Sequence, residues 1–144
     1  MVRTRDDLLV LDNQRFEKII LLVEDDATHA QMLEFVLHSE SPYRVISFAS
    51  GSEILQHIDE VKSYQPDLFL LDYKLPAMSG LDLYDRLHFI DDFALIPALM
   101  ITASLSKALE EAVAQRQLSL IYKPFEIDDL LSKIQHMLVT GNNI

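Results

Sequence analysis

The chain has 144 residues, of which 49% are hydrophobic and 24% charged, the size and balance of one globular domain. Its formal net charge of −11 disfavours direct binding to nucleic-acid backbones or anionic lipid, and the lack of cysteine excludes disulfides and thiolate chemistry. No apolar run reaches the roughly 18 residues of a membrane span, and residues 1–7 lack the apolar core of a signal peptide. We therefore expect a cytoplasmic protein without DNA binding or membrane insertion.

Short apolar runs alternate with helical periodicities along the chain. Strands are predicted at residues 19–23, 43–48, 68–71, 98–101 and 118–122. A helix with an apolar stripe follows each strand, and the stripes are Ala30, Leu33 and Leu37; Ile54, Ile58 and Val61; Leu83, Leu87 and Ile90; Leu105, Leu109, Ala112 and Val113; and Ile127, Leu130, Leu131, Ile134 and Leu138. We divide the chain into an N-terminal extension (1–15), one domain (16–140) and a tail (141–144).

Five strands alternating with five helices predict an α/β fold, a doubly wound parallel sheet with helices on both faces. The first, third and fourth strands are continuous apolar runs, as central strands are, whereas Arg44, Ser47 and Ser119 interrupt the second and fifth. The flavodoxin-like strand order 2-1-3-4-5 satisfies this pattern. It predicts a ligand site between strands one and three, beyond their carboxyl ends.

Polar residues follow four of the five strands, at the ends that this order places side by side. They are Glu24, Asp25 and Asp26, then Asp72, Thr102, and Lys123. Each has an ordinary structural explanation on its own, and Asp26 is expected to cap the next helix. Together they favour a single site, because adjacent carboxylates repel one another unless a counter-charge is present. Mg²⁺, which uses few carboxylates and keeps several waters, suits such a site, and Lys123 adds positive charge.

In order and spacing, these residues resemble the receiver domain of two-component response regulators, the family of the chemotaxis protein CheY. The resemblance covers roughly residues 16–140. The motifs that carry it are Val23-Glu24-Asp25-Asp26, Leu71-Asp72-Tyr73-Lys74-Leu75-Pro76 with Met78-Ser79-Gly80, Ile101-Thr102-Ala103, and Lys123-Pro124-Phe125.

The resemblance implies a Mg²⁺ site and a phosphoacceptor. Asp72 is the expected phosphoacceptor and also a metal ligand. Asp25 is expected to bind the metal directly and Glu24 through a water, while Lys74 contributes its backbone carbonyl. Phosphoryl transfer depends mainly on positioning and on cations that neutralise the phosphoryl oxygens, which agrees with these roles.

The resemblance also implies the rest of the switch and its partners. Thr102 is expected to bond the phosphoryl oxygen and Lys123 to pair with it, with a cis peptide bond before Pro124. The phosphoryl donor is a sensor histidine kinase or a histidine phosphotransfer protein. A downstream protein would read the face formed by the fourth helix, fifth strand and fifth helix, roughly residues 105–138. The chain ends just after this helix, so we expect a single-domain receiver that acts through a protein contact or passes the phosphoryl group on in a relay; the alternative is one domain of a larger protein.

One position departs from the family pattern. The family usually has Tyr or Phe three residues before the lysine, where this chain has Leu120. Tyr122 lies one residue before Lys123 and points to the same side of its strand. We therefore expect a smaller rearrangement on activation. The five histidines are His29, His38, His57, His88 and His136, and we expect most of them at the surface or at helix ends.

Two other functions compete with a phosphorylated switch. The first is a Mg²⁺-dependent phosphatase with Asp72 as nucleophile, like the haloacid dehalogenase family. That family places its nucleophile after the first strand and a second Asp two residues on, where this chain has Lys74. The second is a pseudo-receiver that binds partners without phosphorylation, against which the complete set of acidic residues, Thr102 and Lys123 argues.

Overall fold

The computed structural model describes residues 17–116 and 118–141. The predicted extension, 1–15, and residues 142–144 of the predicted tail lie outside this part. Parallel strands form one sheet in the order β2-β1-β3-β4-β5, which confirms the predicted topology. The strands are β1 (Ile19–Val23), β2 (Arg44–Phe48), β3 (Leu68–Asp72), β4 (Ala98–Thr102) and β5 (Ser119–Tyr122).

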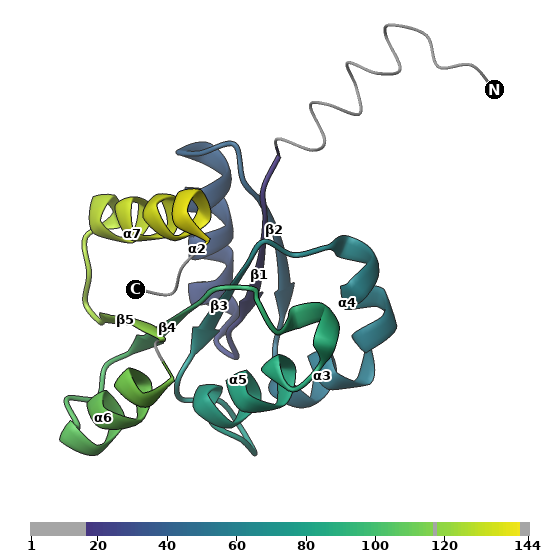
Figure 1. The fold of residues 1–144 in the computed structure, drawn as a ribbon. Helices are drawn as coiled ribbons and strands as arrows, with labels where there is room; N and C mark the ends of the chain where they lie inside the picture. The colour runs from purple at the N-terminus through teal and green to yellow at the C-terminus, as the bar shows by residue number, and fades with distance from the viewer. Residues whose placement is uncertain (1–16, 117, 142–144) are drawn as a thin grey trace, which may run out of the picture.

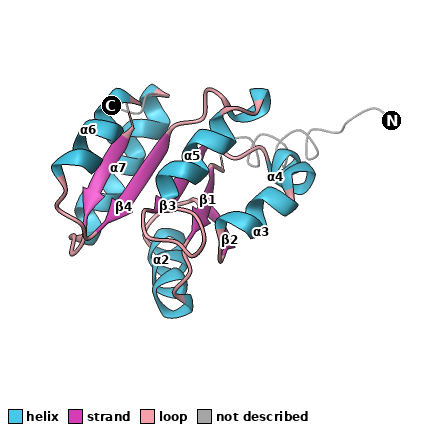
Figure 2. Cartoon of the chain, turned by 90° about the horizontal axis from the view of Figure 1, so that it is seen from below, coloured by secondary structure: helices cyan, strands magenta, loops and turns pink. Residues whose placement is uncertain are grey.

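Helices cover both faces of the sheet. Figure 1 shows α2 (Ala27–Ser39) and α7 (Ile127–Thr140) together on one face. The other face is covered by α3 (Gly51–Gln56), α4 (Ile58–Tyr64), α5 (Gly80–His88) and α6 (Lys107–Gln115). Figure 2 gives a second view of the same layers. Among the described residues, no helix is both long and apolar enough to cross a bilayer.

The hydrophobic core has two layers, one on each side of the sheet. Leu68 and Leu70 of β3 pack in the layer under α2 and α7, while Phe69 and Leu71 pack in the opposite layer. Every residue of β3 and β4 is buried, which explains why these strands read as continuous apolar runs. The strands β2 and β5 are half-exposed at the edges, in agreement with the interruptions in their sequences.

Three helix boundaries differ from the predicted stripes. The second predicted helix is broken at His57, whose ring Nδ1 lies 2.7 Å from the carbonyl oxygen of Glu53. A continuous helix would use that carbonyl for the backbone N–H of His57, which instead donates to Ile54. Helix α5 ends at His88, before Ile90. Leu105 precedes α6 and is 83% exposed, because Ser106 caps that helix.

The register of the sheet brings the carboxyl ends of the strands to one edge. Val23 lies opposite Leu71, and Asp72 lies opposite Ile101. At the far side, Thr102 lies opposite Tyr122. The loops that follow β1, β3, β4 and β5 therefore open at the same edge, where the topology predicted a ligand site.

Candidate functional site

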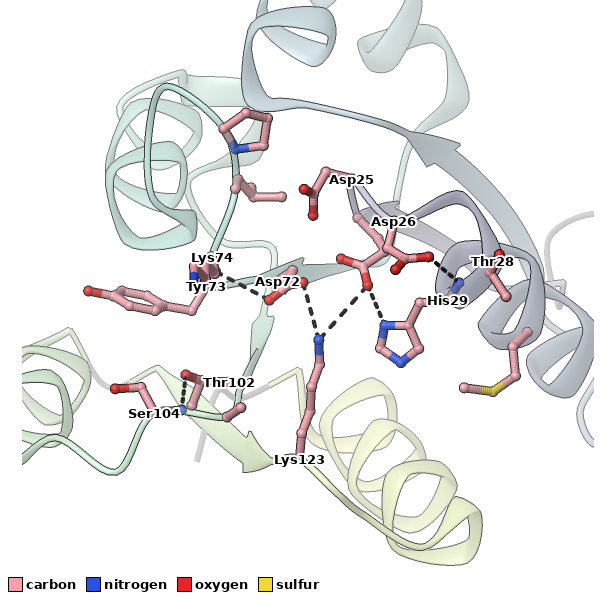
Figure 3. A pocket seen from close by; sticks show the side chains of 15 residues that line it. Asp25, Asp26, Thr28, His29, Asp72, Tyr73, Lys74, Thr102, Ser104 and Lys123 are labelled. Atoms are coloured by element: carbon pink, nitrogen blue, oxygen red, sulfur yellow. Dashed lines mark hydrogen bonds and ion pairs between the residues drawn. The ribbon is translucent and has the colours of Figure 1, made fainter.

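A pocket opens at this edge of the sheet, at the predicted switch point. Figure 3 shows side chains from the loops after β1, β3, β4 and β5 converging on it. The residues predicted for the site all line the pocket: Glu24, Asp25, Asp72, Lys74, Thr102 and Lys123. Asp26 also lines it and caps α2, with its Oδ1 accepting the backbone N–H of His29 at 3.0 Å. The structure thus brings together every predicted site residue.

Three carboxylates form the acidic part of the pocket. Glu24, Asp25 and Asp72 each offer an oxygen, and these oxygens all lie within 4.8 Å of one another. Glu24 and Asp72 are buried, with exposures of 3% and 7%, while Asp25 is exposed. Glu24 Oε2 is buried without a hydrogen-bond partner among the residues that the structure describes. An oxygen set of this kind fits a hard divalent cation that retains waters, because a bound water can satisfy the buried oxygen.

The pKa of Glu24 also indicates a site that lacks positive charge. Burial first, and then the neighbouring carboxylate of Asp72, raise the pKa of Glu24 from 4.5 to about 8, although Lys123 opposes this rise. A buried carboxylate beside another carboxylate favours its neutral form. A divalent cation at the pocket would favour the ionised form and so lower this pKa.

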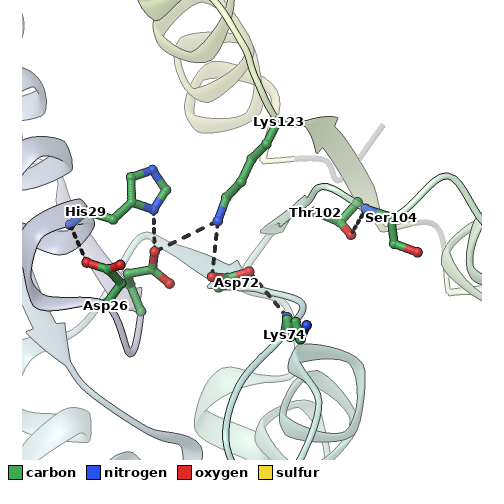
Figure 4. Close-up of polar contacts among 8 residues, drawn as sticks. Asp26, His29, Asp72, Lys74, Thr102, Ser104 and Lys123 are labelled. Atoms are coloured by element: carbon green, nitrogen blue, oxygen red, sulfur yellow. Dashed lines mark hydrogen bonds and ion pairs between the residues drawn. The ribbon is translucent and has the colours of Figure 1, made fainter.

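Lys123 brings a positive charge of the chain itself next to the carboxylates of the pocket. Its Nζ donates to Asp72 Oδ2 at 3.2 Å and lies 3.9 Å from Glu24 Oε1. Figure 4 shows the side chain reaching from the end of β5 across to the end of β3. The peptide bond between Lys123 and Pro124 is cis, which confirms the prediction. Lys123 is therefore within reach of any group attached to Asp72.

The backbone around Asp72 fixes its second carboxylate oxygen. The backbone N–H of Lys74 donates to Asp72 Oδ1 at 3.2 Å. The backbone N–H of Gly80 donates to the Tyr73 carbonyl at 2.7 Å, which holds the start of α5 against the end of β3. Across the pocket, buried Thr102 accepts the backbone N–H of Ser104 at 3.0 Å through its Oγ1. Asp72 is thus held from both sides, by a backbone amide and by Lys123.

His29 is the residue of this site that sequence reasoning missed. Its Nδ1 forms a hydrogen bond with Glu24 Oε1, and its ring lines the pocket (Figure 4). Burial lowers the pKa of His29, and the nearby Lys123 lowers it further, so the neutral imidazole is favoured. The available signal was its position five residues after Glu24 and in the first turn of α2, where Asp26 is the N-cap. This position is close to the end of β1 along the chain, although it does not by itself fix where the side chain points.

Leu120 and Tyr122, the two residues of β5 where this chain departs from the family pattern, have different surroundings. Leu120 packs against the core layer under α3 to α6. Tyr122 is half-exposed, and its hydroxyl donates to Glu110 Oε1 on α6 at 2.6 Å. That hydrogen bond raises the pKa of Tyr122 above its ordinary value. The aromatic residue of β5 is therefore tied to the surface of α6.

Comparisons with known proteins agree with this geometry. The sequence profile of the Response regulator receiver domain matches residues 20–135. The chain is similar to Sporulation initiation phosphotransferase F of Bacillus subtilis, with 30% identity over 86% of this chain and 96% of the relative. It is also similar to the polar-differentiation response regulator DivK of Brucella anthropi, with 30% identity over 84% of this chain and 96% of the relative.

Solved structures give the same picture. A CheY-like receiver domain protein from Methanospirillum hungatei has a TM-score of 0.76 and 28% identity, covering 87% of this chain and 96% of its own. The receiver domain of a sensor histidine kinase from Pseudomonas aeruginosa has a TM-score of 0.72 and 25% identity, covering 85% of this chain and 98% of its own. That structure has a magnesium ion coordinated in its active-site cleft.

Proposed function

Because this chain belongs to the response regulator receiver family, we propose that Asp72 accepts the phosphoryl group in a pocket that Mg²⁺ occupies. As a receiver domain of a two-component or phosphorelay system, the chain is a signalling switch rather than an enzyme acting on small substrates. The single observation that supports Asp72 as the phosphoacceptor is its position among an ammonium group, a backbone amide and two other carboxylates. Lys123 Nζ lies 3.2 Å from Oδ2, the Lys74 amide 3.2 Å from Oδ1, and the other carboxylates within 4.8 Å.

The donor in this proposal is a phosphohistidine of a sensor kinase or a phosphotransfer protein. A carboxylate oxygen of Asp72 forms a bond to phosphorus while the bond between phosphorus and the donor nitrogen breaks, leaving the electron pair on the imidazole. The product is an acyl phosphate, a reactive group suited to a reversible signal. Lys123 would pair with the new phosphoryl oxygens, and its hydrogen bond to Asp72 Oδ2 supports this role. Thr102, at the end of β4, would bond another of them.

Glu24, Asp25 and Asp72, with the backbone carbonyl of Lys74, would hold the metal. The buried and unpartnered Oε2 of Glu24 supports this assignment. When bound, Mg²⁺ neutralises charge on the phosphoryl oxygens. We assign residues 16–140 to the receiver domain, 1–15 to an extension and 141–144 to a tail. A cytoplasmic location, expected from the sequence, belongs to the same proposal.

Acetyl phosphate with Mg²⁺, followed by intact mass measurement, tests the phosphoacceptor. The wild-type chain should gain the mass of one phosphoryl group, and Asp72→Asn should gain none. Asp26→Asn is the matched control, because Asp26 lines the same pocket and Asn also caps helices well. Equal phosphorylation of the Asp72→Asn and Asp26→Asn variants would show that Asp72 is the wrong residue. A wild-type chain that gains no phosphoryl mass would support the pseudo-receiver instead.

The output in this proposal is a protein contact on α6, β5 and α7, roughly residues 105–138. Support comes from the positions of Thr102 and Lys123: Thr102 ends β4 and Lys123 directly follows β5, at this side of the sheet. Beryllofluoride with Mg²⁺ mimics the acyl phosphate and permits a comparison of amide chemical shifts. We expect the largest shifts in residues 103–116. Large shifts confined to α2, α3 and α4 would place the output elsewhere.

A further inference from the structure

Glu24 is held in an asymmetric way that leaves one of its two oxygens without a partner. Its Oε1 has two nitrogen neighbours, His29 Nδ1 at hydrogen-bond distance and Lys123 Nζ at 3.9 Å. Its Oε2 is buried and has no partner among the described residues. A carboxylate that is fixed through one oxygen can turn only slightly, so the direction of the other oxygen is set by the group that holds the first.

From this geometry we infer that His29 is a positioning residue, which holds Glu24 Oε1 so that Oε2 faces the metal site. The inference rests on the proposed function, because it concerns how the chain holds the Mg²⁺ of that function. The neutral imidazole can donate its Nδ1–H to the ionised carboxylate of Glu24. Groups that orient a ligand from outside the coordination sphere commonly change metal affinity by about 10–100-fold when they are removed.

His29 would also hold Glu24 when Asp72 is phosphorylated. Lys123 lies closer to Asp72 Oδ2, at 3.2 Å, than to Glu24 Oε1, at 3.9 Å. A phosphoryl group on Asp72 adds negative charge on that side of Lys123 and draws its ammonium away from Glu24. His29 can stay on Oε1, because its backbone belongs to the first turn of α2, which Asp26 rather than Asp72 caps. Glu24 therefore keeps a hydrogen-bond donor in both states of the switch.

Mg²⁺ titration followed by amide chemical shifts tests this role directly and does not depend on phosphoryl transfer. His29→Leu removes the donor, whereas His29→Asn keeps an amide N–H close to the place of Nδ1. We expect His29→Leu to weaken Mg²⁺ binding about tenfold or more. We expect His29→Asn to stay within about threefold of wild type. Urea unfolding of each variant shows whether α2 and the domain remain intact.

The outcomes separate this inference from the function on which it rests. A wild-type chain that binds Mg²⁺ and a His29→Leu variant of equal affinity would overturn the role of His29 and leave the proposed function standing. Equal weakening in the Leu and Asn variants would also overturn it, because the lost donor would then not be the cause. A wild-type chain without any Mg²⁺ binding would overturn the proposed metal site and the role of His29 together.

Discussion

Gly80 lies so close to the backbone of Asp72 that even one added methyl group is predicted to disturb the site. A Cβ atom built on Gly80 would overlap the carbonyl oxygen of Asp72, and it would lie 3.0 Å from both the Asp72 carbonyl carbon and Tyr73 Cα. These are backbone atoms at the end of a central, fully buried strand. They are unable to turn away as a side chain does, so Gly80→Ala must separate α5 from β3.

The expected cost follows from this overlap. Overpacking of a tight interior contact costs about 1–3 kcal/mol, and the upper part of that range applies because backbone must move. Alanine offsets at most about 1 kcal/mol through its better helix propensity. We therefore expect Gly80→Ala to lower the free energy of unfolding by about 2 kcal/mol. Movement of Asp72 should also weaken the binding of Mg²⁺.

Gly51 provides a matched control within the same chain. Like Gly80, it is the first residue of a helix and follows a serine N-cap. A Cβ on Gly51 would meet only side chains, with Met78 Sδ at 2.7 Å and Met78 Cγ at 3.0 Å. The flexible Met78 side chain can move, so Gly51→Ala should change the free energy of unfolding by no more than about 0.5 kcal/mol.

Urea denaturation followed by circular dichroism measures both variants, and Mg²⁺ titration reports on the site. The two identical substitutions, at equivalent helix positions, should differ clearly in their effect on the free energy of unfolding. If Gly80→Ala and Gly51→Ala have unfolding free energies within about 0.5 kcal/mol of each other, the close approach of Gly80 to Asp72 does not constrain this domain. An unchanged Mg²⁺ affinity in Gly80→Ala would show that the backbone shift stops short of the carboxylates.

Three further predictions concern protonation, a surface ion pair and the switch. The pKa of Glu24 in the folded state is about 8, above its ordinary 4.5, so the folded chain binds the extra proton and its metal-free stability falls as pH rises through 8. Between pH 7 and 9, where His29 is neutral, the free energy of unfolding should fall by about 1 kcal/mol. Either Glu24→Gln or saturating Mg²⁺ should remove most of this pH dependence. An equal pH dependence in Glu24→Gln would show that Glu24 is not the group that titrates. Arg116 donates to both carboxylate oxygens of Asp85 at 2.8 Å, but the pair is partly exposed. Asp85→Asn should therefore lower the free energy of unfolding by only about 0.5–1 kcal/mol, and by less in 1 M salt. A loss of stability that is the same in high salt would contradict this. Leu120→Tyr should enlarge the beryllofluoride-induced amide shifts of α6; unchanged shifts would show that Leu120 does not limit the switch.

The fold was accessible from the sequence because its signals are local and redundant. Continuous apolar runs marked β3 and β4 as central strands, and polar interruptions such as Arg44 marked the edges. The breaks in the helices were harder to predict, because they depend on single hydrogen bonds. The ring of His57 takes the carbonyl that would continue its helix, and the hydroxyl of Ser106 starts α6 after Leu105. Apolar periodicity does not report such competition.

In the site, likewise, the residues at strand ends could be predicted from the sequence, but the residue within a helix could not. Asp72 and Thr102 end their strands and Lys123 follows β5, so strand order alone predicts that they meet. His29 lies inside a helix, where a histidine is ordinarily a surface residue. Its contact with Glu24 depends on the direction in which α2 leaves β1, after the cap that Asp26 forms. The position of the cap could be read from the sequence, but the direction of the helix could not.

Tyr122 shows how a residue on the expected face of a strand can still have an unexpected partner. Strand periodicity places Tyr122 and Leu120 on the same side of β5, and the register pairs Tyr122 with Thr102 and Leu120 with Met100. Leu120 is one pleat further from the pocket and lies over the core. Tyr122 lies at the rim, where Glu110 of α6 accepts its hydroxyl at 2.6 Å. The aromatic link between β5 and α6 is therefore a surface hydrogen bond next to Thr102. Such a link can break or form without opening the core, because neither Tyr122 nor Glu110 is buried.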